Sequence, residues 1–279
     1  MKFLEILKAI FLGIVEGITE WLPVSSTGHM ILVDEFLKLN VSPEFKEMFL
    51  VVIQLGAICA VPVLFFERLN PFSGKKDNAA KKRTLSLWGK VIVGAVPAAV
   101  IGFLLDDFFD EHFYNFTVVA IALVVYGVAF ILIERLRRNK ADRVVDVEDL
   151  TYKDALIIGS FQVLSLIPGT SRSGSTIIGA MLSGTSRSAG AEFSFFMAIP
   201  IMIGASLLKI LKFILEGFKA SGFELFLLFV GIAVSFIVSL LAIKFLMDFV
   251  KKHSFTPFGI YRIILGALVL GYFLIKTFA

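Results

Sequence analysis

The sequence has few charged residues for its length. Only 18% of its 279 residues are charged, whereas 57% are hydrophobic, and the mean hydropathy is +0.87. A soluble domain usually contains roughly 45–50% apolar residues, and the alternating ten-residue pattern of a transmembrane barrel is absent. Several apolar runs are instead long enough to cross a hydrocarbon core of about 30 Å as helices. We therefore predict an all-α, polytopic membrane helical bundle that forms a single domain over residues 1–279.

Cysteine is nearly absent as well, because Cys59 is the only one in the chain. A single cysteine excludes a disulfide within the chain and a metal site built from several thiolates. Free cysteine is among the most buried residue types, and Cys59 falls inside an apolar run. We therefore expect it to be a small residue of the core.

Basic residues outnumber acidic ones, which gives a formal net charge of +4, but they fall in short loops between apolar runs. Loops 67–90 and 134–154 are rich in lysine and arginine, which mark the cytoplasmic side of a membrane protein. We therefore place both loops in the cytoplasm and expect no nucleic-acid partner. The first apolar stretch carries charges and lacks a small-residue cleavage pattern, so we expect no cleavable signal.

Six apolar runs are uninterrupted and long enough to span. They cover residues 45–66, 87–105, 116–133, 193–215, 223–247 and 258–275. We expect the second run to end in an acidic turn at residues 106–111. Two further apolar stretches, 1–39 and 155–184, are interrupted at Pro23 and Pro168, and each piece is too short to span alone. Non-helical backbone at membrane depth is tolerated only where it lines a cavity or is buried in protein, so we predict two re-entrant helix hairpins.

The second half of the chain repeats the pattern of the first. Gly13, Glu16 and Pro23 correspond in order to Gly159, Gln162 and Pro168, with one residue inserted before the break in the first half. Repeat one covers about residues 1–138 and repeat two about 150–279, each with one hairpin and three spans. Because three is odd, the repeats must be inverted, and the site of such proteins lies at the repeat interface near the bilayer midplane. By this count the first hairpin and both chain ends lie on the outer side, and the site opens there.

The second break reads PGTSRSGST from Pro168 to Thr176, with a helix expected to begin near Ser173. Backbone N–H groups at a helix start and in a turn bind phosphate, and arginine binds phosphate oxygens with two hydrogen bonds. Ser175 stands where a nucleotide-binding P-loop needs lysine, and no strand precedes it, which excludes that motif. The alternatives for Arg172 are that it reaches to the membrane interface or pairs structurally with a carboxylate.

Two carboxylates precede the first break. Glu16 and Glu20 lie four residues apart, so on a helix they share one face. Such a pair suits a divalent cation such as Mg²⁺ or Ca²⁺ or a general acid/base. The alternative is a buried structural pair that shares a proton or is tied to Arg172. Ionisable groups at membrane depth are functional by default, and both roles would serve a phosphate held at the facing break.

The first break itself is a run of small polar residues that ends in a histidine. It contains Ser25, Ser26, Thr27, Gly28 and His29. His29 is suited to proton transfer or phosphate binding, although a lone histidine is more often a packing or surface residue. The hydroxyls are suited to phosphate chemistry and equally to helix capping and close helix packing.

These motifs resemble those of a known family. EGITEWLPVSSTGH from Glu16 to His29 and PGTSRSGST from Pro168 to Thr176 are similar to the two signature motifs of the bacterial undecaprenyl-diphosphate phosphatases associated with bacitracin resistance. The resemblance extends over the whole chain, including IQLGAI at residues 53–58. It implies a multi-pass hydrolase of the bacterial plasma membrane that removes the terminal phosphate of undecaprenyl diphosphate. This reaction recycles the lipid carrier for peptidoglycan and other wall polymers, and bacitracin would compete for the same lipid diphosphate.

The resemblance also implies roles for residues at matching positions. The catalytic residues would be Glu20, Ser26, His29 and Arg172. The substrate-binding residues would be Glu16, Ser25, Thr27, Gly28, Gly169, Ser171, Ser173, Gly174 and Thr176. In that scheme Ser26 attacks the terminal phosphorus, Glu20 or His29 manages its proton, and Arg172 neutralises charge; attack by water that Glu20 activates is the alternative. The family is regarded as assisted by divalent cations, and Glu16 with Glu20 offers a place for one.

A carrier is the rival interpretation. Inverted repeats are typical of alternating access, so the pattern also fits a polyprenyl-phosphate flippase or a small-anion transporter. The clustering of Ser26, Glu20 and His29 favours the phosphatase, because transport needs anion ligands but no nucleophile beside a base. Both a monomer and a homodimer fit the sequence.

Overall fold

The computed structural model describes residues 2–278, apart from the side chains of residues 106, 107, 110, 277 and 278. The α-helices are α1 (Lys2–Thr19), α2 (Ser26–Phe36), α3 (Pro43–Val52), α4 (Gln54–Leu64), α5 (Phe66–Leu69), α6 (Asn78–Phe113), α7 (Phe116–Arg137), α8 (Tyr152–Gln162), α9 (Arg172–Leu182), α10 (Arg187–Leu215), α11 (Gly222–Val250) and α12 (Thr256–Phe278). Two 3₁₀ helices, η1 (Val147–Asp149) and η2 (Val163–Leu166), complete the described elements. The predicted all-α class is confirmed.

Six segments are long and apolar enough to cross a membrane. They are Pro43–Leu64 (α3 with α4), Asn78–Leu105 (within α6), Phe116–Arg137 (α7), Arg187–Leu215 (α10), Gly222–Val250 (α11) and Thr256–Lys276 (within α12). Each overlaps one of the six predicted spans. The protein is therefore a multi-pass membrane protein.

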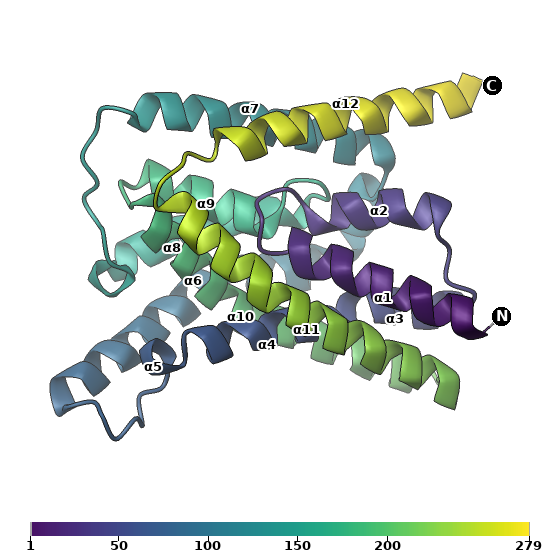
Figure 1. The fold of residues 1–279 in the computed structure, drawn as a ribbon, viewed down its shortest axis with the longest axis horizontal. Coiled ribbons are helices and arrows are strands. Elements are labelled where there is room, and N and C mark those ends of the chain that lie inside the picture. The colour runs from purple at the N-terminus through teal and green to yellow at the C-terminus, as the bar shows by residue number, and fades with distance from the viewer. Residues whose placement is uncertain (1, 279) are drawn as a thin grey trace.

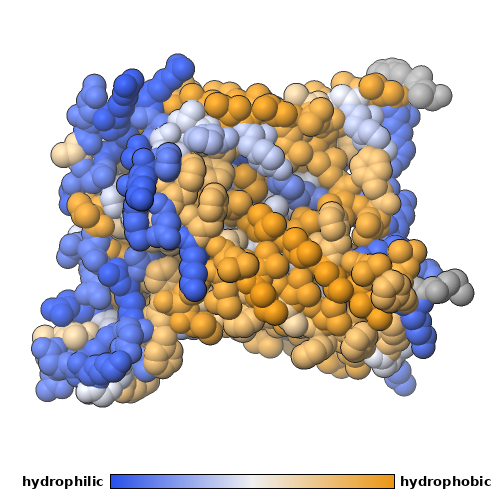
Figure 2. All heavy atoms as spheres, viewed as in Figure 1, coloured by the Kyte–Doolittle hydropathy of each residue, from blue (hydrophilic) through white to orange (hydrophobic). Residues whose placement is uncertain are grey.

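The surface has the form expected for such a protein. Figure 2 shows a broad hydrophobic belt between two hydrophilic ends. In the same view, α5 and the two loops rich in lysine and arginine lie at one end of the molecule (left in Figure 1). The first residues of α1 and the last of α12 lie at the opposite end. Both ends of the chain therefore lie on one side of the belt, away from the basic loops.

Two details of the spans differ from the predictions. Leu105 leaves the helical region with φ −125°, but α6 resumes after it and continues to Phe113. The acidic residues 106, 107 and 110 therefore lie on a helical extension rather than in a turn, and their side chains are outside the described part. Cys59 is exposed on α4, not buried. Lipid tails are as apolar as a protein core, so an apolar run in a membrane helix does not distinguish buried from lipid-facing positions.

The first interrupted stretch forms α1 and α2. α1 ends at Thr19, four residues before Pro23, so Glu20 lies in the turn and not on the helix with Glu16. Its N–H still donates to Glu16 O at 3.0 Å, which continues the helical bonding by one residue. The prediction that both carboxylates lie on one helix face is therefore wrong in detail, because the helix stops before the proline that breaks it.

The second interrupted stretch forms α8, η2 and α9. Thr151 and Asp154 form a capping box at the start of α8, which ends at Gln162. After η2 and an irregular turn, α9 begins at Arg172, one residue before the predicted Ser173. Both predicted breaks are thus present, each at a segment where proline lacks the N–H that a helix needs.

Each interrupted pair packs against a long helix from the other half of the chain. α1 lies along α11, and α8 lies along α6 (Figure 1). A Cβ at Gly17 would lie 2.8 Å from Ser235 O on α11, and a Cβ at Gly159 would lie 2.0 Å from Gly94 O on α6. Such backbone contact requires glycine, and close packing of small residues holds helices together in a membrane. The long helices therefore fix the place of both turns.

Candidate active site

The two turns meet inside the bundle. Ser173 Oγ, on α9, donates to backbone oxygens of the first turn, to Glu20 O at 3.2 Å and to Leu22 O at 3.3 Å. Trp21 in the first turn is fully buried and packs edge-on against Phe195 of α10, with ring centroids 5.1 Å apart. The predicted meeting of the two breaks is confirmed.

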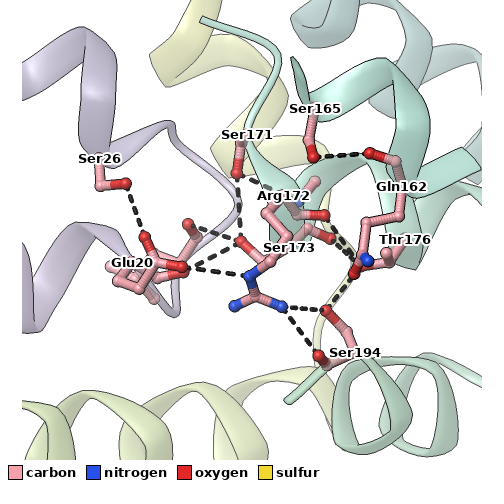
Figure 3. A network of polar contacts seen from close by, with 11 residues as sticks. Glu20, Ser26, Gln162, Ser165, Ser171, Arg172, Ser173, Thr176 and Ser194 are labelled. Carbon is pink, nitrogen blue, oxygen red and sulfur yellow. Dashed lines mark hydrogen bonds and ion pairs between the residues drawn. The ribbon is translucent and has the colours of Figure 1, made fainter. Parts of the chain in front are cut away.

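A carboxylate joins a serine of the first turn to the arginine of the second. Ser26 Oγ donates to Glu20 Oε2 at 2.7 Å, and Arg172 Nε donates to Glu20 Oε1 at 3.2 Å (Figure 3). The side chains of Arg172 and Glu20 are only 10% and 8% exposed. Three of the four predicted catalytic residues are therefore in direct contact, in an environment where water screens their charges little.

Arg172 is anchored on both sides of this ion pair. Its Nη1 donates to Ser194 O on α10 at 2.8 Å, and its guanidinium lies 5.7 Å from the centroid of the Trp21 ring. Thr176 holds the same corner, because its Oγ1 donates to Arg172 O at 2.9 Å and lies 2.6 Å from Ser194 Oγ. Nη2 of Arg172 is buried and has no hydrogen-bond partner in the described structure. The arginine thus keeps one N–H group free for an anion.

The predicted serines of both turns cap the helices that follow. Ser25 and Ser171 have the rare positive φ values of 73° and 71°. Ser25 Oγ accepts from Gly28 N at 3.2 Å, and Ser171 Oγ accepts from Gly174 N at 3.1 Å. Capping was the structural alternative for the hydroxyls of the first turn, and the geometry supports it for Ser25 and shows the same role for Ser171.

The remaining residues of the second turn complete its backbone. Gly169 has φ 92°, and a Cβ there would lie 2.6 Å from Val119 O on α7. Ser171 Oγ and Ser173 Oγ lie 3.1 Å apart. The predicted Thr27 of the first turn is half-buried at the start of α2. Both segments named in the sequence analysis therefore lie at the site.

His29, the fourth predicted catalytic residue, makes its described hydrogen bonds to Ser25 and Tyr261. Its Nδ1 lies 2.7 Å from Ser25 O, and its Nε2 lies 2.6 Å from the hydroxyl of Tyr261 on α12. The two rings are parallel, with centroids 5.7 Å apart. Both ring nitrogens are thus engaged, and the described contact to the Ser26 hydroxyl comes from Glu20.

A divalent cation was expected at Glu16 and Glu20. Among residues 2–278 as described, no group of three or more His, Cys, Asp or Glu side chains is arranged to hold a metal ion. Glu16 is 1% exposed, its Oε1 has no hydrogen-bond partner, and the charges of Glu20 and Arg172 act on it. Mg²⁺ needs only one or two carboxylates when waters and phosphates complete its shell. The free carboxylate oxygen of Glu16 beside Glu20 fits such an ion.

Four residues of the site were not anticipated. They are Trp21, Ser194, Tyr261 and Arg262. Ser194 and Trp21 give no local signal, because their contacts with Arg172 depend on how distant helices pack. Arg262 is different, since an arginine inside the predicted span 258–275 is itself a functional signal at membrane depth.

This arrangement suits chemistry on a phosphate group. The Ser26 hydroxyl donates to the Glu20 carboxylate, an arrangement that can activate a serine as a nucleophile. Nη2 of Arg172 and Nε1 of Trp21 are buried donors without partners, and such donors stabilise the charge that develops on phosphoryl oxygens. The site therefore combines a hydroxyl, a carboxylate and buried hydrogen-bond donors.

The sequence also matches known proteins over nearly its whole length. The family model described as bacitracin resistance protein BacA matches residues 9–268. The chain is 59% identical to an undecaprenyl-diphosphatase of Enterococcus faecalis, with 98% of this chain and 99% of the relative covered. It is 60% identical to undecaprenyl-diphosphatase 1 of Clostridioides difficile, with 98% and 97% covered, and 57% identical to an undecaprenyl-diphosphatase of Streptococcus mutans, with 99% of each covered. The chain therefore belongs to the BacA family of bacitracin resistance proteins.

Proposed function

We propose that this chain is an undecaprenyl-diphosphate phosphatase. It removes the terminal phosphate of undecaprenyl diphosphate and releases undecaprenyl phosphate, the lipid carrier of peptidoglycan synthesis, together with inorganic phosphate. The observation that carries this function is the hydrogen bond from Ser26 to Glu20, whose second oxygen is held by Arg172. The relatives named undecaprenyl-diphosphatase cover the whole chain and support the same substrate. Bacitracin competes for that lipid diphosphate.

The reaction follows from the contacts of Ser26. Its Oγ attacks the terminal phosphorus while Glu20 Oε2 takes the hydroxyl proton, and the bond to the bridging oxygen breaks. Undecaprenyl phosphate leaves with the electron pair of that bond. Water then attacks the phosphorus of the phosphoserine, the bond from Ser26 Oγ to phosphorus breaks, Glu20 returns its proton to Ser26 Oγ, and inorganic phosphate leaves. Arg172, fixed by Glu20 and Ser194 O, directs its free Nη2 at the phosphoryl oxygens and neutralises their charge. In the alternative route, Glu20 activates a water that attacks the phosphorus directly.

Glu16 and Glu20 are the residues that would hold a divalent cation. The free Oε1 of Glu16 supports this assignment. A bound Mg²⁺ or Ca²⁺ would supply charge neutralisation between the carboxylates and the diphosphate. Phosphate release measured with and without a chelator tests it, and a loss of activity that added Mg²⁺ or Ca²⁺ restores is the expected result.

The site lies between two inverted repeats, about 1–138 and 150–279, in one membrane domain. Each repeat carries one re-entrant hairpin, and the first enters from the outer face of the plasma membrane. The similar caps at Ser25 and Ser171, and the packing of α1 on α11 and of α8 on α6, support this arrangement. The basic loops opposite to both chain ends support an orientation in which the site opens outward.

The experiment that tests the function is phosphate release from undecaprenyl diphosphate by purified protein in detergent. We expect Ser26→Ala and Arg172→Ala to lower kcat by roughly 10³-fold or more. Rapid quenching with a substrate labelled in the terminal phosphate separates the two routes, because only Ser26 attack leaves label on the protein. Near-wild-type turnover by both variants would show that the site is misplaced.

The rival function, a carrier for a polyprenyl phosphate or a small anion, makes no use of the Ser26 contact. Transport needs ligands for the anion, and Arg172 with the two capped turns would provide them. Transport does not need a hydroxyl group that donates a hydrogen bond to a carboxylate. That contact therefore favours hydrolysis, and phosphate release by the purified protein decides between the two.

A further inference from the structure

Arg262 of α12 is a charged residue in an unusual place. It is 0% exposed and lies within the membrane span Thr256–Lys276. A buried charge is costly unless it is paired, yet no carboxylate of the described residues lies within ion-pair distance of it. Its Nε is buried without a hydrogen-bond partner. A residue kept at this cost calls for a role that a neutral side chain does not provide.

The contacts of Arg262 go to the backbone of both turns. Nη1 donates to Pro23 O at 3.1 Å in the first turn. Nη2 donates to Gly169 O at 2.7 Å and to Thr170 O at 3.0 Å in the second turn. The guanidinium also lies 5.5 Å from the centroid of the Tyr126 ring on α7. Because its donors form a rigid planar fork, one side chain fixes the distance between two segments that are far apart in the sequence.

These carbonyls lie shortly before the capping serines that precede Ser26 and Arg172. Pro23 lies two residues before Ser25, and Thr170 is followed at once by Ser171. Both serines have positive φ, a conformation that persists only where the surroundings enforce it. The hydrogen bonds of Arg262, which lies on α12, restrain the backbone before both serines. They therefore hold the two strained caps from which Ser26 and Arg172 project.

The charge of Arg262 also reaches the site. A Cβ at Gly174 would lie 3.4 Å from its Nη1, so the guanidinium lies against the start of α9. Its charge also acts on His29. Arg172 is paired with Glu20, whereas the partners of Arg262 are carbonyl oxygens and the Tyr126 ring, so no anion among the described residues neutralises its charge. An incoming phosphate experiences this charge in a medium of low dielectric constant.

We propose that Arg262 is a positioning residue of the phosphatase reaction. It fixes the Pro23 turn and the Gly169–Thr170 turn at the separation at which Ser26, Glu20 and Arg172 meet, and its unneutralised charge favours binding of the diphosphate. The proposal rests on the placement of the site at those three residues. It assigns to α12, which contributes none of the reacting groups, the task of joining the two halves of the site.

Two substitutions separate the two parts of this role. Arg262→Lys keeps the charge but cannot donate to three carbonyls in one plane, so we expect kcat to fall about 10- to 100-fold. KM and inhibition by inorganic phosphate should change less than about threefold, since the charge remains. Arg262→Met removes both features, so we expect the same loss in kcat and, in addition, phosphate inhibition weakened by at least about tenfold. Phosphate release from undecaprenyl diphosphate in detergent gives all three quantities.

Arg187→Lys is the matched control. Arg187, at the start of α10, forms an ion pair with Glu134 of α7 and contacts neither turn. We expect it to lower the unfolding temperature without changing kcat. Should Arg262→Met fail to fold, Tyr126→Leu tests the same role more mildly, because it removes the ring beside the guanidinium and leaves Arg262 in place. A fall in kcat with KM unchanged is expected.

Two results would overturn the proposal. One is wild-type kcat and KM in Arg262→Lys. The other is a loss of kcat that follows the unfolding temperature equally in the Arg262 and Arg187 variants, which would mean a merely structural role. If Ser26→Ala and Arg172→Ala are inactive while the Arg262 variants are not, this proposal alone is wrong. If all of them are active, the placement of the site is wrong.

Discussion

Ser25 in the first turn and Ser171 in the second occupy the same place in two similar structures. Their φ values are 73° and 71°, and each caps the next helix through the N–H three residues on. Each follows a buried polar side chain by nine residues, Glu16 in the first half and Gln162 in the second. The caps, rather than the prolines, are therefore the equivalent points. Aligning the two prolines required one inserted residue, whereas aligning the two caps requires none.

The residue after each cap shows where the turns differ. It is Ser26 in the first turn and Arg172 in the second, and both contact Glu20, at 2.7 Å and 3.2 Å. The same backbone position thus brings a hydroxyl to one oxygen of the carboxylate and a guanidinium to the other. The difference teaches that a repeated backbone can provide unlike groups at one site, provided that the two copies face each other.

Arg172→Lys is the strongest way to break this comparison. Lysine keeps the charge of the second turn but cannot bind Glu20 and Ser194 O while offering a further N–H. We expect kcat for phosphate release to fall by about 10²- to 10³-fold, the usual cost of losing one group that stabilises the transition state. Arg143→Lys, at the Asp154 ion pair of α8, is the control and should keep its activity. Wild-type kcat in Arg172→Lys would mean that only the charge of the second turn matters.

Glu16→Gln makes the first half resemble the second at the position nine residues before the cap. The amide keeps the size of the side chain and removes the charge that a divalent cation requires. We expect activity to fall about 10- to 100-fold, and the remaining activity to respond less to chelator and added Mg²⁺. Glu216→Gln, an exposed carboxylate at the end of α10, is the control. Unchanged activity and unchanged response to Mg²⁺ would remove Glu16 from the site.

Local patterns in the sequence predicted much of this site. The apolar runs predicted the six membrane helices, and the two runs of proline, glycine and hydroxyl residues predicted the breaks. The start of α9 at Arg172 differs from the prediction by one residue. These features succeed because hydrophobicity, proline and capping act within a few residues of their own position.

The contacts of Arg262 and Tyr261 could not be predicted in this way. Arg262 binds Pro23 and Gly169, which are 239 and 93 residues away. The contact of His29 with Tyr261 was not predicted, and it forms because α12 passes close to α2. Such partners are set by helix packing, and the composition of a span says only that it is apolar. The exposure of Cys59 has the same cause.

Substitutions of the two caps sharpen the comparison at the level of stability. Ser25→Ala and Ser171→Ala each remove a cap, and we expect each to lower the free energy of unfolding by about 1 kcal/mol. Glycine accepts positive φ without strain, so Ser25→Gly and Ser171→Gly should be close to neutral. Thermal unfolding in detergent measures both, with Ser160→Ala, whose Oγ donates only to Leu156 O on α8, as the control. Equal losses for the alanine and glycine variants would show that the positive φ is not strained.

We expect the smallest effect from a substitution of Tyr261, which is the partner of His29 and has no counterpart at the second turn. Four residues after its cap the first turn has His29, bound to Tyr261, whereas the second has the fully buried Ser175. Tyr261→Phe removes the hydroxyl and keeps the parallel ring, so it costs one partly exposed hydrogen bond, roughly 0.5 kcal/mol or slightly more. We expect kcat to fall about two- to threefold and the unfolding temperature to fall by no more than about 2 °C. A loss comparable to that of Arg172→Lys would instead make His29, oriented by Tyr261, a second proton carrier, and the first turn would then supply every proton transfer of the reaction.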